Sequence, residues 1–272
     1  MTTMLFYEKP VPLNVDIHLK TRLAPSEGGV GYAANTNSIP LAAVEFVDAA
    51  REYPVVFTGK EGGAMFPIVL VGVRHNENLF VTSENRWDGR YIPAFVRRYP
   101  FVLAEKQGAD DFNVYIDEAY PGFGVVDGER LFTDDGEHAA VLKHALEFLS
   151  NYQGEIVRTR LFVERLQSLD LLVPRVLDVV RANDAPLVLQ GFSVVDEQRL
   201  ASLGDADLLG LVRDGYLALI YSHMGSLSNV ARLSERLAAR LAPSAETDDI
   251  ASAESAPAPR KKRGNGVAAR ER

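Results

Sequence analysis

The spacing of hydrophobic residues divides the chain into two parts. In the first part, short apolar runs rich in β-branched and aromatic residues predict strands at 55–59, 66–73, 78–82, 101–105 and 113–117. Residues 41–52 carry apolar side chains near helical spacing between Pro40 and Pro54, so they predict a helix. We expect the turn at 74–78 to join the second and third strands as a hairpin. The whole part is then an antiparallel sheet with a covering helix.

A helical period dominates the second part. Residues 136–172 predict a long helix in which Gly154 marks a break or kink, and residues 215–240 predict a final apolar-striped helix. Between them we predict a β-hairpin at 175–196, turning at 182–184, and two short helices with aspartate N-caps at 196–203 and 205–213. The fold class is therefore α+β: an antiparallel sheet half with a covering helix, then a helical half with an inserted β-hairpin.

The C-terminal part of the sequence differs in composition. From Pro243 onward it consists mostly of Ala, Ser, Pro, Glu and Asp followed by basic residues, with almost no large apolar side chains. Such a segment buries too little apolar surface to offset the entropy of ordering, so residues 242–272 predict a disordered tail. Residues 1–241 predict a single α+β domain, which could divide into sub-halves at 1–130 and 131–241.

Composition and charge narrow the class of protein. The chain has 272 residues, of which 47% are hydrophobic and 24% charged, and its formal net charge of -8 makes nucleic acid an unexpected partner. It has no cysteine, which excludes disulfides, a thiol nucleophile and a thiolate metal site. The N-terminal sequence lacks a secretory pattern, and no apolar run reaches the ~18 residues of a membrane span. We therefore expect a soluble, cytoplasmic protein.

The segment NRWDGRYIPAFVRRYPF, residues 85–101, combines the tryptophan of this chain with four more aromatic residues and four arginines. Pro93 suits the first turn of a short helix, and Pro100 ends it. Aromatic residues recur every four positions at Trp87, Tyr91, Phe95 and Tyr99. From the second of these onward, the spacing predicts one face of a helix.

Two interpretations of this aromatic-arginine segment stay open. In the first, the rings belong to the core and the arginines pair with nearby carboxylates. In the second, arginines rim a pocket floored by rings, because guanidinium groups bind carboxylates or phosphates and rings stack on ligands. The candidate ligand-binding residues are Trp87, Arg90, Tyr91, Arg97 and Arg98. The ligand would be a peptide C-terminus, an organic acid or a nucleotide.

The other polar motifs predict no metal site and no cofactor. His75 and Glu77 have the histidine-x-acid spacing of some iron enzymes, but they lie in the expected turn at 74–78. His138 and His144 are six positions apart on an expected helix, so they face roughly opposite sides. The glycine-rich run GKEGGAMFP lacks the residue order of a phosphate-binding loop and predicts a hairpin loop. No catalytic residue is assigned.

Several segments together resemble the SapC family. The aromatic-arginine segment at 87–101 is the most specific of them, and the others are 39–57, 78–81, 127–137, 189–203 and 215–227. The resemblance covers roughly residues 5–236. The family takes its name from a gene in a surface-layer protein locus, and its members occur in gene neighbourhoods with TonB-dependent receptors and halogenase-like proteins. The resemblance implies a context in surface-layer or outer-membrane uptake biology, but it supplies no catalytic residues.

These observations support three hypotheses about function. The first is a non-catalytic binding or accessory protein that recognises a peptide or an acidic small molecule through the surface from Trp87 to Arg98. The alternative is an enzyme that modifies an amino acid or a peptide, with or without a metal ion, using His75 or the arginines. The third is an assembly protein whose helix at 215–240 contacts a protein partner through apolar residues: Tyr216, Met224 and Leu227.

Overall fold

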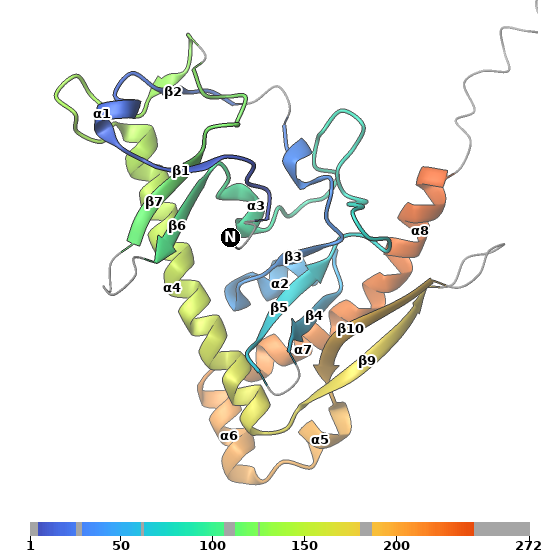
Figure 1. Ribbon diagram of the computed structural model, residues 1–272. Helices are drawn as coiled ribbons and strands as arrows, with labels where there is room; N and C mark the ends of the chain where they lie inside the picture. Colours follow the sequence, from blue (N-terminus) through green and yellow to red (C-terminus); the bar gives the residue numbers. More distant parts are fainter. Residues whose placement is uncertain are drawn as a thin grey trace, which may run out of the picture. The chain divides into compact units, whose positions relative to one another are not determined.

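The computed structural model describes residues 5–25, 29–60, 63–105, 112–124, 126–179 and 187–241. Contacts within the chain group Met1–Arg240 into one unit and Leu241–Arg272 into a second. The predicted tail at 242–272 and the predicted hairpin turn at 182–184 lie outside the described residues. The described part combines antiparallel sheets with helices, which confirms the α+β class (Figure 1).

In the described part, the largest sheet has five antiparallel strands in the order β3-β5-β4-β10-β9. Its strands are β3 (Ser38–Pro40), β4 (Val55–Gly59), β5 (Met65–Leu70), β9 (Leu172–Val179) and β10 (Leu187–Val195). The predicted hairpin of β9 and β10 is confirmed. It completes the sheet that the first part of the chain begins, because Ser193 of β10 pairs with Phe57 of β4.

The other described strands form separate sheets. β1 (Pro10–Pro12), β7 (Phe112–Asp117) and β6 (Phe101–Glu105) pair in that order, and β2 (Arg22–Leu23) pairs with β8 (Glu129–Arg130). The strands predicted at 101–105 and 113–117 are confirmed, and they pair with each other. Phe101 and Ile116 of these strands belong to a second hydrophobic cluster with Leu142 and not to the cluster around the large sheet.

The predicted strand at 78–82 is wrong. Val81 makes only an isolated bridge with Trp87, and the rest of this segment forms turns and loop within the described residues. The side chain of Asn78 is buried, accepts the amide of Phe80 and donates to the carbonyl of Ala33. The side chain of Asn78 therefore holds this segment in a turn and ties it to the distant residue Ala33, in place of a strand ladder.

The predicted helix at 41–52 is much shorter than expected. It consists of the 3-10 turn η2 (Ala43–Glu45) followed by α2 (Phe46–Ala49). Two of the apolar residues in this range are exposed, Val44 at 62% and Val47 at 50%. Glu45 and Glu52 are buried instead, at 4% and 5% exposure. Tertiary contacts of these carboxylates override the local pattern.

The helices of the second part follow the predicted ranges more closely. They are α4 (Ala140–Ser168), α5 (Glu197–Ala201) and α6 (Asp205–Arg213). α4 runs unbroken through Gly154, where a Cβ would meet no atom within 4 Å, so the predicted break is wrong. Asp196 caps α5 as predicted, but Gly204 and not Asp205 is the N-cap residue of α6.

The predicted final helix at 215–240 is divided. It consists of α7 (Tyr216–Ser226), the 3-10 turn η3 (Leu227–Asn229) and α8 (Val230–Leu241). At the division, the buried Ser226 accepts the amide of Val55, and Asn229 donates to the carbonyl of Ala50. The remaining short helices are α1 (Val15–His18), η1 (Gly31–Ala33) and α3 (Ala94–Arg97).

Of the hydrophobic clusters in the described part of the chain, two pack against the sheets, and α4 contributes to both. The larger cluster surrounds the five-stranded sheet and includes Phe57 and Phe162. The smaller cluster surrounds the three-stranded sheet and includes Phe101 and Leu142. α4 contacts β6 near one end and β5 near the other, as its course in Figure 1 shows. This helix therefore packs against both sheets.

Candidate functional site

Two buried carboxylates hold the aromatic-arginine segment in place. Glu45 Oε1 accepts hydrogen bonds from the hydroxyl of Tyr91 and from the amide of Ala94, each at 2.7 Å. Its Oε2 accepts a backbone amide of its own turn at 2.9 Å. Glu52 Oε2 accepts the amide of Arg90 at 2.7 Å and that of Tyr91 at 3.3 Å. These carboxylates thus pair with backbone amides and a phenol, and not with arginine side chains.

Trp87 and Tyr91 pack against the rest of the protein through the same network. Trp87 Nε1 donates to the hydroxyl of Tyr53 at 3.0 Å and to the carbonyl of Tyr91 at 3.1 Å. Its ring stacks with that of Phe80. Burial raises the pKa of Tyr91, and the charge of Glu45 raises it further, so the phenol stays protonated. Since α3 has only four residues, the prediction that the aromatic side chains share one helical face is wrong.

Arg97 and Arg98 lie at the C-terminal end of α3 and contact aromatic rings. The Arg97 guanidinium lies 5.3 Å from the ring centre of Phe148. The Arg98 guanidinium lies 3.8 Å from the ring centre of Phe95 and 5.7 Å from that of Tyr152. Within the described residues neither arginine forms an ion pair. Arg98 Nε is buried there without a hydrogen-bond partner.

A cavity of about 450 Å³ lies beside these arginines, and we call it the α3 cavity. Its lining includes Arg97, Arg98, Tyr99, Tyr120, His144 and Phe148. The last two side chains come from α4, and the first three come from α3 and the turn after it. A ligand in this cavity would meet two guanidinium groups and several aromatic rings.

A second cavity of about 390 Å³, the middle cavity, shares Arg98 with the first. Its lining includes Met65, Phe95, Arg98, Tyr152, Ile156 and Arg160. Burial raises the pKa of Tyr152, although the charge of Arg98 opposes the rise, so Tyr152 keeps its proton. Arg98 is therefore part of the wall of both cavities.

The structure brings two of the five candidate binding residues to these cavities. Arg97 and Arg98 line the α3 cavity. Three candidates line neither the α3 cavity nor the middle cavity, and they are Trp87, Arg90 and Tyr91. The rings beside the arginines come from α4 and from Phe95. Ligand binding at any of these residues stays a prediction.

Sequence reasoning does not find the contribution of α4. Phe148, Tyr152 and Ile156 follow one another at four-residue spacing, which indicates a common helical face. That spacing is the only signal for them in the sequence, and it does not say which element the face contacts. The meeting of this face with Arg97 and Arg98 depends on packing between segments about fifty positions apart.

The described histidines occupy separate environments. His75 is exposed in a turn, and His144 lines the α3 cavity. His223 is buried, with Nδ1 2.7 Å from the carbonyl of Val55 and Nε2 accepting the amide of Val195 at 3.0 Å. Burial lowers the pKa of His223 to about 4, so its ring is neutral and ties β4 to β10. Within the described ranges, no group of three or more His, Asp and Glu side chains could hold a metal ion.

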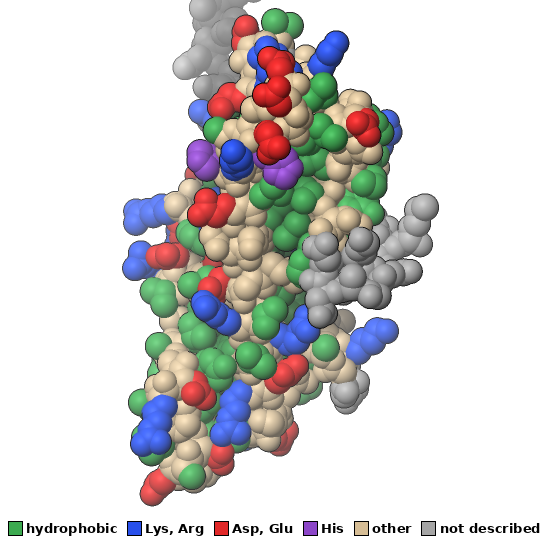
Figure 2. Space-filling view, turned by 90° about the vertical axis from the view of Figure 1, so that its left-hand side faces the viewer, with side chains coloured by type: hydrophobic (Ala, Val, Ile, Leu, Met, Phe, Trp, Pro, Cys, Tyr) green, Lys and Arg blue, Asp and Glu red, His purple; other side chains and the backbone are tan. Residues whose placement is uncertain are grey.

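The surface offers no simple charge signal on the face in Figure 2, where basic, acidic and hydrophobic side chains are interspersed. The three residues expected at a protein interface, Tyr216, Met224 and Leu227, pack against the cluster around the five-stranded sheet. No helix in the described part of the chain has the length and apolar character that a membrane crossing requires.

The fold and the site define an α+β protein in which a long helix and an arginine-bearing turn enclose cavities. The SapC family matches residues 13–233, a range that includes the five-stranded sheet, α3 and α4. The chain therefore belongs to the SapC family, as the resemblance of its segments predicts. No curated protein and no solved structure matches the chain.

Proposed function

We propose that this SapC-family protein is a binding protein whose ligand places a carboxylate against Arg97 and Arg98. The ligand is a peptide or an acidic small molecule, and its apolar part occupies the α3 cavity. The observation that carries this proposal is the environment of Arg98: its Nε is buried without a partner in the described residues, and the side chain lines two cavities. The charge of this guanidinium has no ion-pair partner within the described residues, so a carboxylate bound in either cavity would stabilise it.

The chemistry of the cavity wall supports an apolar or aromatic acid. A guanidinium group offers paired N–H donors that match the two oxygens of a carboxylate. The rings of Tyr99, Tyr120 and Phe148 offer surface against which an apolar group stacks. The volume of about 450 Å³ lies within the ~300–1,000 Å³ typical of small-molecule sites.

The family supplies the biological context of this proposal. SapC relatives are linked to a surface-layer locus and to TonB-dependent receptors, so we propose that binding serves surface-layer or outer-membrane uptake biology. An accessory protein of this kind would hold or deliver its ligand without transforming it. Such a role needs side chains that recognise the ligand, but it needs no set of catalytic residues.

Thermal unfolding of the full chain in the presence of small acids tests the proposal. The probes are phenylacetate, N-acetylphenylalanine and a tetrapeptide ending in phenylalanine, and the corresponding amides are the matched neutral controls. A ligand at ~100 times its dissociation constant adds ~2.7 kcal/mol to the free energy of unfolding. We expect at least one acid to raise the midpoint while its amide does not.

Two variants localise the effect. Arg98→Ala should abolish the shift, and Arg98→Lys should weaken it, because lysine keeps the charge but lacks the paired donors. Arg86→Ala is the matched control, since Arg86 is an exposed arginine of the same segment that lines neither cavity and is not a candidate binding residue. The proposal is contradicted if none of the three acids raises the midpoint of thermal unfolding. It is also contradicted if an acid raises the midpoint of Arg98→Ala and Arg98→Lys as much as that of the wild type.

A further inference from the structure

A third cavity lies where the five-stranded sheet opens between β4 and β10, and we call it the seam cavity. Its volume is about 690 Å³. The ladder between these strands has one residue pair, Phe57 with Ser193, and next to it the Thr58 hydroxyl donates to the carbonyl of Gly191 at 3.2 Å. Gly191 has a φ of +87° and lies in an irregularity of β10, a conformation that favours glycine. The irregularity lies in the pairing of β10 with β9, next to the residue pair that β10 makes with β4.

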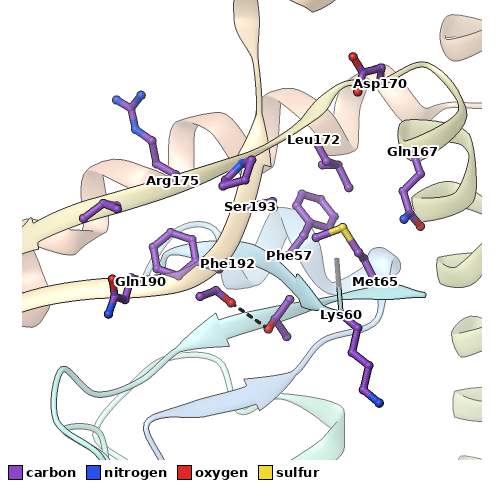
Figure 3. Close-up of a pocket in the computed structure, with 15 residues that line it drawn as sticks. Phe57, Lys60, Met65, Gln167, Asp170, Leu172, Arg175, Gln190, Phe192 and Ser193 are labelled. Atoms are coloured by element: carbon purple, nitrogen blue, oxygen red, sulfur yellow. Dashed lines mark hydrogen bonds between the residues drawn. The ribbon is translucent and has the colours of Figure 1, made fainter. Parts of the chain in front are cut away.

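The seam cavity has an apolar floor and a charged rim (Figure 3). Phe57, Met65 and Leu172 point towards the space between the strands. The charged ends of Lys60 and Arg175 point outward at its edges. An occupant would therefore insert an apolar side chain while keeping polar groups at the rim.

The three cavities follow one face of α4. The α3 cavity and the middle cavity share Arg98, and the middle cavity and the seam cavity share Met65. From one end of the helix to the other, the α4 residues in their walls include Val141, His144, Phe148, Ile156, Val163 and Gln167. Separations of three, four, seven or eight positions keep these residues on one side of a helix. At ~1.5 Å per residue the row extends ~39 Å along α4.

The row is basic on a protein that is acidic overall. Among the described residues, five basic ones line it: Lys60, Arg97, Arg98, Arg160 and Arg175. The acidic residues in the described part of its wall are Glu129 and Asp170, and Asp170 is ion-paired with Arg199. Since the chain carries a net charge of -8, an acidic partner is attracted to this row and repelled by the rest of the surface.

We infer that the row of cavities along α4 binds one extended, acidic polypeptide segment that carries apolar side chains between its carboxylates. A row of ~39 Å corresponds to about 12 residues of extended chain at ~3.3 Å per residue. Successive side chains of an extended chain point to opposite sides, so alternate apolar side chains enter the cavities while carboxylates reach the basic rim. The inference rests on the proposed function, because Arg97 and Arg98 would hold the first carboxylate.

Fluorescence polarisation on the full chain tests the length and charge of the occupant. The probes are fluorescein-labelled peptide pools of 4, 8 and 12 residues composed of Glu, Asp, Leu, Phe and Ala. We expect the dissociation constant to fall at least about tenfold from the shortest to the longest pool. Pools with Lys and Arg in place of the acids should bind at least about tenfold more weakly. A 12-nucleotide single-stranded DNA should not displace the longest acidic pool.

Charge reversal at the far end of the row separates this inference from the proposed function. Arg175→Glu should weaken binding of the 12-residue pool about tenfold and leave the 4-residue pool unchanged. Arg213→Glu, the same change at an exposed arginine of α6 outside the row, should leave both unchanged. Arg98→Ala should weaken both pools.

Three outcomes overturn the extended site. Equal affinity for the short and long acidic pools shows that only one cavity is used, and the proposed function then stands alone. If Arg175→Glu is folded, as its thermal midpoint shows, and binds the 12-residue pool as tightly as the wild type does, then again only one cavity is used. If the DNA binds more strongly than the acidic pool, the occupant of the row is a nucleic acid and not an acidic polypeptide. Loss of the small acids as well as the peptides removes the proposed function too.

Discussion

The segment at 42–55 and the cavity-lining face of α4 both involve charged side chains, but they use them in opposite ways. In the segment, Glu45 and Glu52 are buried and each accepts several hydrogen bonds. Polar side chains from distant elements bond to its backbone, and they are Thr159, Ser226 and Asn229. Beside α4, Arg97 and Arg98 lie against rings and cavities, without an ion pair in the described part of the chain.

The difference shows how structural charges can be told from charges available to a ligand. A buried charge is costly unless it is paired and hydrogen-bonded, so a fully partnered carboxylate indicates a structural role. A guanidinium that borders a cavity and forms no ion pair can still bind a carboxylate. Sequence position does not make this distinction, since Tyr91 and Arg98 belong to the same short segment. Tyr91 is bonded to Glu45 in the structural network, whereas Arg98 lines two cavities.

The largest expected effect is the loss of the paired carboxylate at Glu45. Glu45→Ala leaves three donors without an acceptor, the buried amides of Ala42 and Ala94 and the half-buried hydroxyl of Tyr91. We expect the free energy of unfolding to fall by about 4 kcal/mol, at ~1–3 kcal/mol for each unsatisfied group. Urea denaturation followed by circular dichroism measures this loss.

The control for that variant is Glu155→Ala on α4. Glu155 pairs with Arg158, whose side chain is largely exposed, so its removal should cost less than about 1 kcal/mol. If the two variants lost equal stability, the segment at 42–55 would not be the region held by its buried charges, and the comparison would fail.

A pH titration of stability sharpens the same comparison at His223, which bonds to Val55 at the end of the segment. The folded pKa of about 4 lies below the unfolded value of 6.5, so between these values the unfolded state binds a proton that the folded state does not. The contribution of His223 to the free energy of unfolding is therefore present in full above pH 6.5 and is lost as the pH falls to 4. The expected loss is about 3 kcal/mol.

The contribution of His223 can be isolated by comparison with His223→Gln. Both proteins lose stability in acid through their carboxylates, but the wild type should lose about 3 kcal/mol more between pH 7 and pH 4. His75→Gln, at an exposed turn, should follow the wild-type curve. Parallel curves for wild type and His223→Gln would mean that His223 already accepts a proton in the folded state.

The smallest expected effect belongs to the cavity side. Arg97→Ala removes an exposed guanidinium that contacts rings and forms no ion pair within the described residues, so it should cost about 1 kcal/mol or less. Urea denaturation under the same conditions as for Glu45→Ala gives the value. A loss comparable to that of Glu45→Ala would make Arg97 a structural residue and erase the contrast between the two regions.

Elements with a strong local pattern could be predicted from the sequence. The alternation and β-branched content of β4, β9 and β10, the long helical period of α4 and the Asp196 cap all act over a few residues. The failures at 78–82 and 41–52 have a common cause. There, the side chains of Asn78, Glu45 and Glu52 are buried by contacts with distant residues, and local spacing does not report such contacts.

The sequence by itself determined the α+β class, membership of the SapC family, and the concentration of arginines and aromatic rings at 85–101. Only the tertiary structure decided that Glu45 and Glu52 would hold the first half of that segment while Arg98 would border two cavities. The physical reason is the sequence separation over which each kind of interaction acts. Periodicity and turn chemistry are properties of neighbours in the chain, whereas hydrogen-bond partners and cavity walls depend on which distant elements α4 packs against.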